Sequence, residues 1–112
     1  MKKFLFIFMA LLILLSGCTN KVGGDYFFKQ INMLEQSLEN PDWKKIATQV
    51  EALKDMYDKN KWKVQLIGDE GEYEGIDESI RRLIAAIKEE DIINIRMELA
   101  TIESLLEGVY TL

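Results

Sequence analysis

The chain has 112 residues, of which 19 are acidic and 14 basic, so its net charge is −5 at pH 7. A negative surface is repelled by phosphate backbones, which argues against nucleic-acid binding. Histidine is absent and a single cysteine is present, so the commonest general base and metal ligand is missing, and no intramolecular disulfide can form.

The first seventeen residues have the three-part layout of a secretion signal. Lys2 and Lys3 form a positive n-region, and Phe4 to Leu15 is an uninterrupted apolar segment of twelve residues. Twelve helical residues rise about 18 Å, which is well short of the ~30 Å hydrocarbon core of a bilayer. The segment therefore predicts a signal peptide over residues 1–17 rather than a stable transmembrane span.

The end of this segment, Leu15-Ser16-Gly17-Cys18, resembles the lipobox of bacterial prolipoproteins. The resemblance implies cleavage between Gly17 and Cys18 and a thioether-linked diacylglycerol on Cys18. The alternative is an uncleaved signal anchor with an incidental cysteine. The position of the chain's one cysteine, directly after the apolar segment and two small residues, favours the lipoprotein. Cleavage would remove two lysines and leave 95 residues with a net charge of −7.

Residues 18–24 then predict a lipidated cysteine and a short polar tether, and residues 25–112 a helical domain. Six tether residues, 19–24, reach at most about 20 Å, so the domain is expected to lie close to the bilayer. From Asp25 onward, apolar residues recur at helical spacing. They mark four segments: Phe27, Ile31, Leu34 and Leu38; Trp43, Ile46, Val50, Leu53 and Tyr57, continuing to Ile67; Ile76, Ile80, Leu83, Ile84 and Ile87; Ile92, Ile95, Leu99, Ile102, Leu105 and Leu106.

Capping and turn residues mark the expected boundaries of these helices. Asn40-Pro41 predicts the start of the second helix, with Asn40 as the cap and Pro41 in the first turn. Asp91 is positioned to cap the fourth helix. Residues 68–75, with three glycines and four acidic residues, predict a loop, after which Ser79 is expected to open the third helix.

The apolar pattern repeats at an offset of 49 residues. Phe27 corresponds to Ile76, and Leu53 corresponds to Ile102. Each copy reads as a helix, a short turn and a second helix, and short connections make consecutive helices antiparallel neighbours. The sequence therefore predicts an all-α fold: a small antiparallel helical bundle of three to four helices, built as two tandem hairpins.

From Trp43 through Trp62 to Ile76-Asp77, and again at residues 103–107, the chain resembles the bacterial family called domain of unknown function 4363. The resemblance implies an N-terminal membrane segment followed by an all-helical region, with no established activity. The chain departs from the family pattern by ending its apolar segment in a lipobox. It also lacks a histidine in the acidic stretch before the third helix, which argues against a metal or proton-transfer role by analogy.

No residue set predicts catalysis, and we expect a protein that is not an enzyme and carries no cofactor. No histidine is present to activate the serines at positions 37, 79 and 104. The carboxylates Glu89, Glu90 and Asp91 cluster at the second hairpin turn, and Glu98 and Glu103 lie on the fourth helix. Capping and solvated polar faces account for all five.

The acidic loop is the best candidate for a small ligand. Glu70, Glu72 and Glu74 alternate ahead of a glycine, like the first half of a calcium loop. Asp77 and Arg81 then stand where an apolar residue and a bidentate glutamate are required. The sequence favours a linker without a metal, and calcium binding remains the alternative.

The aromatic residues and methionines are predicted either to pack in the core or to contact the membrane surface. Trp43 and Trp62 are expected to pack in the bundle, with a ligand sandwich as the alternative. Tyr26 and Phe28, just after the tether, are candidates for the headgroup region of the membrane. The methionines are expected to fill the core: Met33, Met56 and Met97.

The functional prediction is a non-catalytic, lipid-anchored protein-interaction module on the outer face of the cytoplasmic membrane, with a membrane-associated protein as partner. If the organism has two membranes, the inner leaflet of the outer membrane is also open. The alternative is an extracytoplasmic lipoprotein that binds a small molecule or an ion. An interaction module should have an apolar interior and an exposed apolar strip, whereas a binder should have polar groups converging in a pocket.

Overall fold

The computed structural model describes residues 24–110, which form four α-helices. Their bounds are Asp25–Ser37 (α2), Trp43–Ile67 (α3), Glu70–Lys88 (α4) and Ile92–Tyr110 (α5). The all-α prediction is confirmed. Within residues 24–110, none of the helices combines the length and apolar composition needed to cross a membrane. The predictions for the signal peptide, for cleavage at Gly17 and for lipidation of Cys18 lie outside the described residues.

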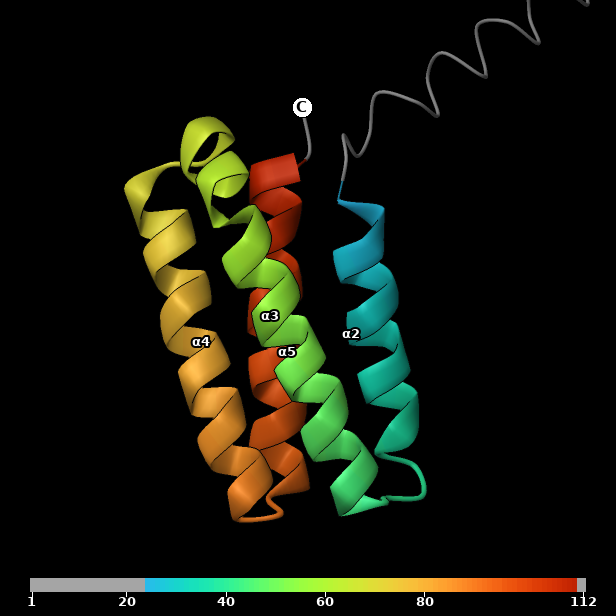
Figure 1. Ribbon diagram of the computed structural model, residues 1–112. Helices are drawn as coiled ribbons and strands as arrows, with labels where there is room; N and C mark the ends of the chain where they lie inside the picture. The colour runs from blue at the N-terminus through green and yellow to red at the C-terminus, as the bar shows by residue number, and fades with distance from the viewer. Residues whose placement is uncertain (1–23, 111–112) are drawn as a thin grey trace, which may run out of the picture.

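The helices run alternately up and down, so each is antiparallel to the next (Figure 1). Each helix packs on the one that follows it, and α5 returns to pack on α2, which closes the bundle. The start of α2, the α3–α4 connection and the end of α5 lie at one end of the bundle, which we call the entry end. The two hairpin turns, at residues 38–42 and 89–91, lie at the opposite end, the turn end.

The connection between α3 and α4 corrects the predicted loop over residues 68–75. Helix α4 already begins at Glu70, and its cap is Asp69. The Asp69 carboxylate accepts a hydrogen bond from the backbone N–H of Glu72 at 2.8 Å, and the Glu72 carboxylate accepts one from the N–H of Asp69 at 3.0 Å. This reciprocal capping box, with acidic residues in the first turn, stabilises a helix start that the glycines oppose. Ser79 consequently lies well inside α4 and does not open it.

Two other predicted helix starts have different outcomes. Asp42, not Asn40, caps α3, since its carboxylate accepts from the N–H of Lys45 at 3.3 Å. Pro41 therefore precedes the cap and lies outside the helix. An ionised carboxylate is a stronger acceptor at a positive helix end than the neutral Asn40 amide, which explains the shift of two residues. Asp91 accepts from the N–H of Asn94 at 3.2 Å, which confirms its predicted role at the start of α5.

The core is apolar and follows the predicted pattern. Its buried hydrophobic residues are Phe27, Ile31, Leu34, Leu38, Ile46, Val50, Leu53, Tyr57, Val64, Ile76, Ile80, Leu83, Ala86, Ile87, Ile95, Leu99, Ile102, Leu106, Val109 and Tyr110. Every predicted apolar pair at the 49-residue offset is buried on both sides, apart from Trp43 and Ile92, which are both half-buried. The interior therefore supports two equivalent hairpins, α2–α3 and α4–α5.

A polar contact repeats at the same offset. The Gln30 side-chain amide donates to the backbone carbonyl of Gln49 at 3.3 Å, linking α2 to α3. Ser79 and Glu98, 49 residues further on, make the same link from α4 to α5, again at 3.3 Å. Helical periodicity alone does not produce an equivalent hydrogen bond, so this contact strengthens the case for a structural repeat.

Candidate functional site

The polar cluster around Ser79 holds two helices together. Ser79 is fully buried, and its hydroxyl also contacts a carboxylate oxygen of Glu98 at 2.5 Å. The other carboxylate oxygen accepts from Arg82 Nε at 2.9 Å. Because the hydroxyl has no exposed surface and Glu98 is already paired with a guanidinium, this arrangement cross-links α4 to α5 and offers a substrate no access.

A second polar cluster ties α3 to α4. The buried Tyr57 hydroxyl donates to the backbone carbonyl of Tyr73 at 3.0 Å. Burial, reinforced by the nearby Asp77 carboxylate, raises the pKa of Tyr57 well above its usual 10.0. The phenol therefore stays protonated and acts as a fixed donor. Asp77 itself pairs with Lys61 at 2.6 Å.

The acidic residues of the predicted loop do not converge on one point. Glu70, Glu72 and Glu74 lie on a helix, where each residue turns by about 100°, so side chains two positions apart point in nearly opposite directions. Glu72 is also engaged in the capping box. Among residues 24–110, no three His, Cys, Asp or Glu side chains are grouped closely enough to hold a metal ion. The resemblance to the first half of a calcium loop therefore has no structural counterpart.

The two tryptophans are too far apart to share a ligand. Both lie on α3, nineteen residues apart, which corresponds to about 28 Å along the helix axis. Trp43 packs against the core beside the turn end, as predicted. Trp62 is 59% exposed, so its expected packing in the bundle is wrong.

The structure confirms only some of the remaining predictions for aromatic residues and methionines. Tyr26 and Phe28 are half-buried and pack against the core, which leaves only part of each ring for the predicted contact with the headgroup region. Met56 packs against the core as predicted. Met33 and Met97 are exposed, which corrects their assignment as core residues.

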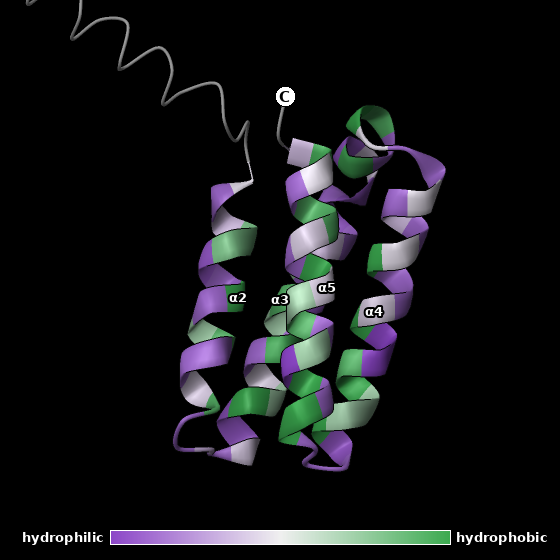
Figure 2. Cartoon of the chain, turned by 180° about the vertical axis from the view of Figure 1, so that it is seen from behind, coloured by the Kyte–Doolittle hydropathy of each residue, from purple (hydrophilic) through white to green (hydrophobic). Residues whose placement is uncertain are grey.

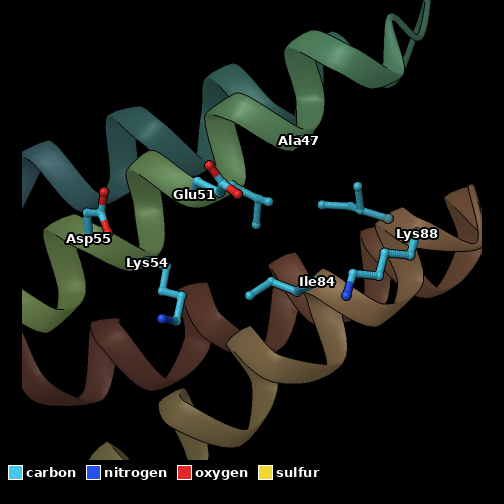
Figure 3. A pocket seen from close by; sticks show the side chains of 8 residues that line it. Ala47, Glu51, Lys54, Asp55, Ile84 and Lys88 are labelled. Atoms are coloured by element: carbon cyan, nitrogen blue, oxygen red, sulfur yellow. The ribbon is translucent and has the colours of Figure 1, made fainter.

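A shallow groove follows the seam between the two hairpins, where α3 and α4 meet (Figure 3). It has a volume of about 410 Å³, and its apolar lining consists of Val50, Ile84 and Ile87 together with Ala47. Charged side chains from both helices flank this lining: Glu51, Lys54, Asp55 and Lys88. The groove is thus an amphipathic surface without a buried polar centre.

The outer face of α5 is the least polar exposed helix surface opposite the core. Its midpoint lies half a turn away from the core residues Ile95, Leu99 and Ile102. Ile93 is 73% exposed and Met97 is 60% exposed. The other exposed residues on this face are Ala100, Thr101, Ser104 and Gly108. None of the six is charged, and Figure 2 shows α5 between α2 and α4, in front of α3.

The equivalent helix of the first hairpin provides an internal reference for this surface. At an offset of 49, the six α5 positions correspond to Lys44, Thr48, Glu51, Ala52, Asp55 and Lys59 on α3. Four of these are charged, and all six are exposed. The buried sides of α3 and α5 match from the pair Ile46 and Ile95 to the pair Tyr57 and Leu106, whereas the outer sides do not. Because the core imposes no such difference, the uncharged outer face of α5 requires another explanation.

Sequence reasoning missed this surface. The sequence pattern predicts Met97 in the core and assigns no role to Ile93. The 49-residue offset contains part of the missing signal: the predicted core pairs are apolar in both copies, whereas Ile93 and Met97 correspond to polar residues, Lys44 and Thr48. The mismatch alone does not mark an exposed position, because the buried Val109 and Tyr110 also correspond to polar residues, Asn60 and Lys61. Ile93 and Met97 combine the mismatch with exposure.

A family model described as "Domain of unknown function (DUF4363)" matches residues 24–112, which include all four helices. No curated protein and no solved structure is significantly similar to the chain.

Proposed function

The chain belongs to the DUF4363 family, a domain of unknown function, and on that premise we propose that it is a non-catalytic, lipid-anchored module that binds a membrane-associated protein through the outer face of α5. The anchor is Cys18, and the bundle lies on the outer face of the cytoplasmic membrane. This proposal rests on one observation above all: the charged outer face of α3 is replaced by an uncharged one on its equivalent, α5.

A helix that is apolar on its core side and uncharged on its outer side is typical of a helix covered on both sides. Covering an exposed Ile93 or Met97 fully contributes about 1.5–3 kcal/mol each. The small side chains of Ala100 and Ser104 leave room for a partner's backbone to approach. The fitting partner is an apolar helix face on another protein held at the same membrane.

The anchor is supported by the sequence of residues 15–18 and by the short tether that follows. Attachment to one membrane confines both proteins to a thin layer, which raises their effective concentration. A surface of modest area is then sufficient for association.

A second candidate function is small-molecule binding in the α3–α4 groove. Its volume of about 410 Å³ lies within the usual range for ligand sites. Its apolar lining and its position at the seam between the hairpins favour a flat apolar ligand. Because its charged residues flank the lining and do not converge inside it, we rank this function second.

Site-specific photo-crosslinking in membranes of the native organism tests the proposal. A photoreactive residue at position 97 should give a discrete adduct with one membrane protein, identified by mass spectrometry. The same residue at position 48, the equivalent exposed position on α3, should not give that adduct. Ile93→Lys, which keeps the helix and charges the face, should abolish the adduct at position 97. Equal adducts from positions 97 and 48, or an adduct indifferent to Ile93→Lys, would contradict the proposal.

A further inference from the structure

A second exposed apolar surface lies at the entry end of the bundle. Its residues are Trp62, Leu66 and Ile67, whose exposed fractions are 59%, 76% and 56%. They occupy the last two turns of α3. Trp62 and Leu66 are one turn apart and therefore share the outer side of the helix. We call these three residues the α3 tip.

The chain enters the bundle at the same end. Gly24, which immediately precedes α2, packs so closely on Tyr110 at the end of α5 that an added Cβ would lie 2.8 Å from the Tyr110 ring. Figure 1 shows the start of α2, the end of α3 and the end of α5 at this common end. Cys18 precedes Gly24 by six residues, which span at most about 20 Å. A lipid on Cys18 therefore keeps the entry end, and the α3 tip with it, next to the bilayer.

We propose that the α3 tip rests in the interfacial region of the phospholipid bilayer, so that the bundle stands with its entry end on the membrane. The inference rests on the proposed lipid anchor and adds a specific protein–lipid contact to it. Trp62 supplies the amphipathic ring that favours the headgroup level, while Leu66 and Ile67 supply apolar area for the acyl boundary. The Lys63 ammonium lies 5.5 Å from the centre of the Trp62 ring, where its stem stays with the apolar residues and its charge can meet a headgroup phosphate.

This orientation also accounts for where the partner surface lies. Ile93 is near the turn end of α5, about 26 Å along the helix from Tyr110 at the entry end. With the α3 tip on the bilayer, the apolar part of the α5 outer face projects away from the lipid and remains accessible from the side. The two exposed apolar surfaces then have different occupants: a bilayer at the α3 tip and a protein on α5.

The two tryptophans of the chain provide the test, because they lie at opposite ends of α3. The full protein, purified with its lipid from a host that processes lipoproteins, is reconstituted into phosphatidylcholine vesicles whose acyl chains are brominated. Trp43→Phe leaves Trp62 as the only emitter, and Trp62→Phe leaves Trp43. Bromine quenches tryptophan only at contact range, so each variant reports the position of one end of the bundle.

The proposal predicts that Trp62 shifts to the blue and loses at least about half of its emission, because a ring at the headgroup level meets the upper acyl chains. Trp43, about 28 Å away along α3, should be unaffected. Leu66→Asp should restore Trp62 emission without releasing the protein. If the protein floats with the vesicles and Trp62 is not quenched, the α3 tip does not contact the bilayer and the inference is wrong. If the protein does not float at all, the proposed anchor fails and the inference fails with it.

Discussion

Glu90 is in a backbone conformation that costs free energy. Its φ of 54° lies in the left-handed region. Asp91 N–H bonds to the carbonyl of Ala86 at 3.0 Å, and Glu90 N–H bonds to that of Ile87 at 3.0 Å. These are the two hydrogen bonds of a Schellman motif, whose left-handed position is usually glycine. A β-carbon there costs about 1–2 kcal/mol.

Glu90→Gly is therefore expected to stabilise the protein by about 1 kcal/mol, net of the extra unfolded-state freedom of glycine. The measurement is the free energy of unfolding in urea. Glu89→Gly is the matched control, because Glu89 is exposed and has right-handed φ and ψ. The control should be neutral or destabilising. Equal effects of the two changes would mean that the strain at Glu90 is absent.

Tyr57 makes stability depend on pH in the alkaline range. Burial first, and the Asp77 carboxylate second, raise its pKa in the folded state above the ordinary value of 10.0. The folded protein then holds a proton that the unfolded chain releases. The contribution of Tyr57 to the free energy of unfolding is therefore fully present below pH 10 and decreases as the pH rises above it.

Urea melts between pH 8 and pH 11 test this effect by comparing the wild type with Tyr57→Phe. Burial also raises the pKa of Tyr110 above the usual 10.0, so Tyr110 contributes to the same alkaline loss of stability in both proteins. The difference between the two proteins isolates the contribution of Tyr57. We expect the wild type to lose more stability above pH 10 than the variant. Parallel curves would show that Tyr57 ionises as easily in the fold as in the unfolded chain.

At the scale of elements, the equivalence of the hairpins has a direct energetic consequence. Leu53 and Ile102 are equivalent at the 49-residue offset, and both are fully buried. Leu53→Ala and Ile102→Ala should each cost about 2–5 kcal/mol. The exposed changes Lys44→Ala and Lys59→Ala should stay within about 0.5 kcal/mol. Denaturant melts of the four variants measure the change in the free energy of unfolding for each. A mild Ile102→Ala would mean that α5 is not packed in the core as α3 is.

The helices could be predicted from the sequence wherever apolar spacing decided the structure. The interior positions of all four helices, and the extension of α3 to Ile67, follow from the period of about 3.6 residues. The start of α4 was missed because Gly68, Gly71 and Gly75 were interpreted as turn residues. The opposing signal was present: Asp69 and Glu72 have the spacing of a capping box. Gly75 instead allows close packing, since an added Cβ would lie 3.0 Å from the Leu105 side chain.

The candidate surfaces were harder to predict than the helices. Apolar residues such as Trp62 and Met97 enter a core assignment by default, because composition does not distinguish a buried side from an exposed one. Helical phase distinguishes them: Met97 and Trp62 lie on the side of their helices opposite the core stripe. The contrast between the outer faces of α5 and α3 becomes visible only when the two copies of the repeat are compared position by position. That the α3 tip and Gly24 lie at the same end of the bundle can be seen only in the folded structure.

At the scale of the whole molecule, the proposed features form one arrangement. The lipid and the α3 tip lie at the entry end, and Ile93 and Met97 lie toward the turn end of α5. The negative charge of the chain keeps the remaining surface away from anionic headgroups. Contact with the membrane is then restricted to the anchor and the apolar tip, and the partner is met at a fixed height above the bilayer.

The proposals for the α5 outer face and for the α3 tip both depend on the lipid at Cys18, so the most direct test is metabolic labelling with palmitate followed by membrane fractionation. The wild-type protein should incorporate label, lose its first 17 residues and remain with the membranes after a high-salt wash. Cys18→Ala should incorporate no label and accumulate as an unprocessed precursor. A labelled, processed and membrane-bound Cys18→Ala protein would contradict the account.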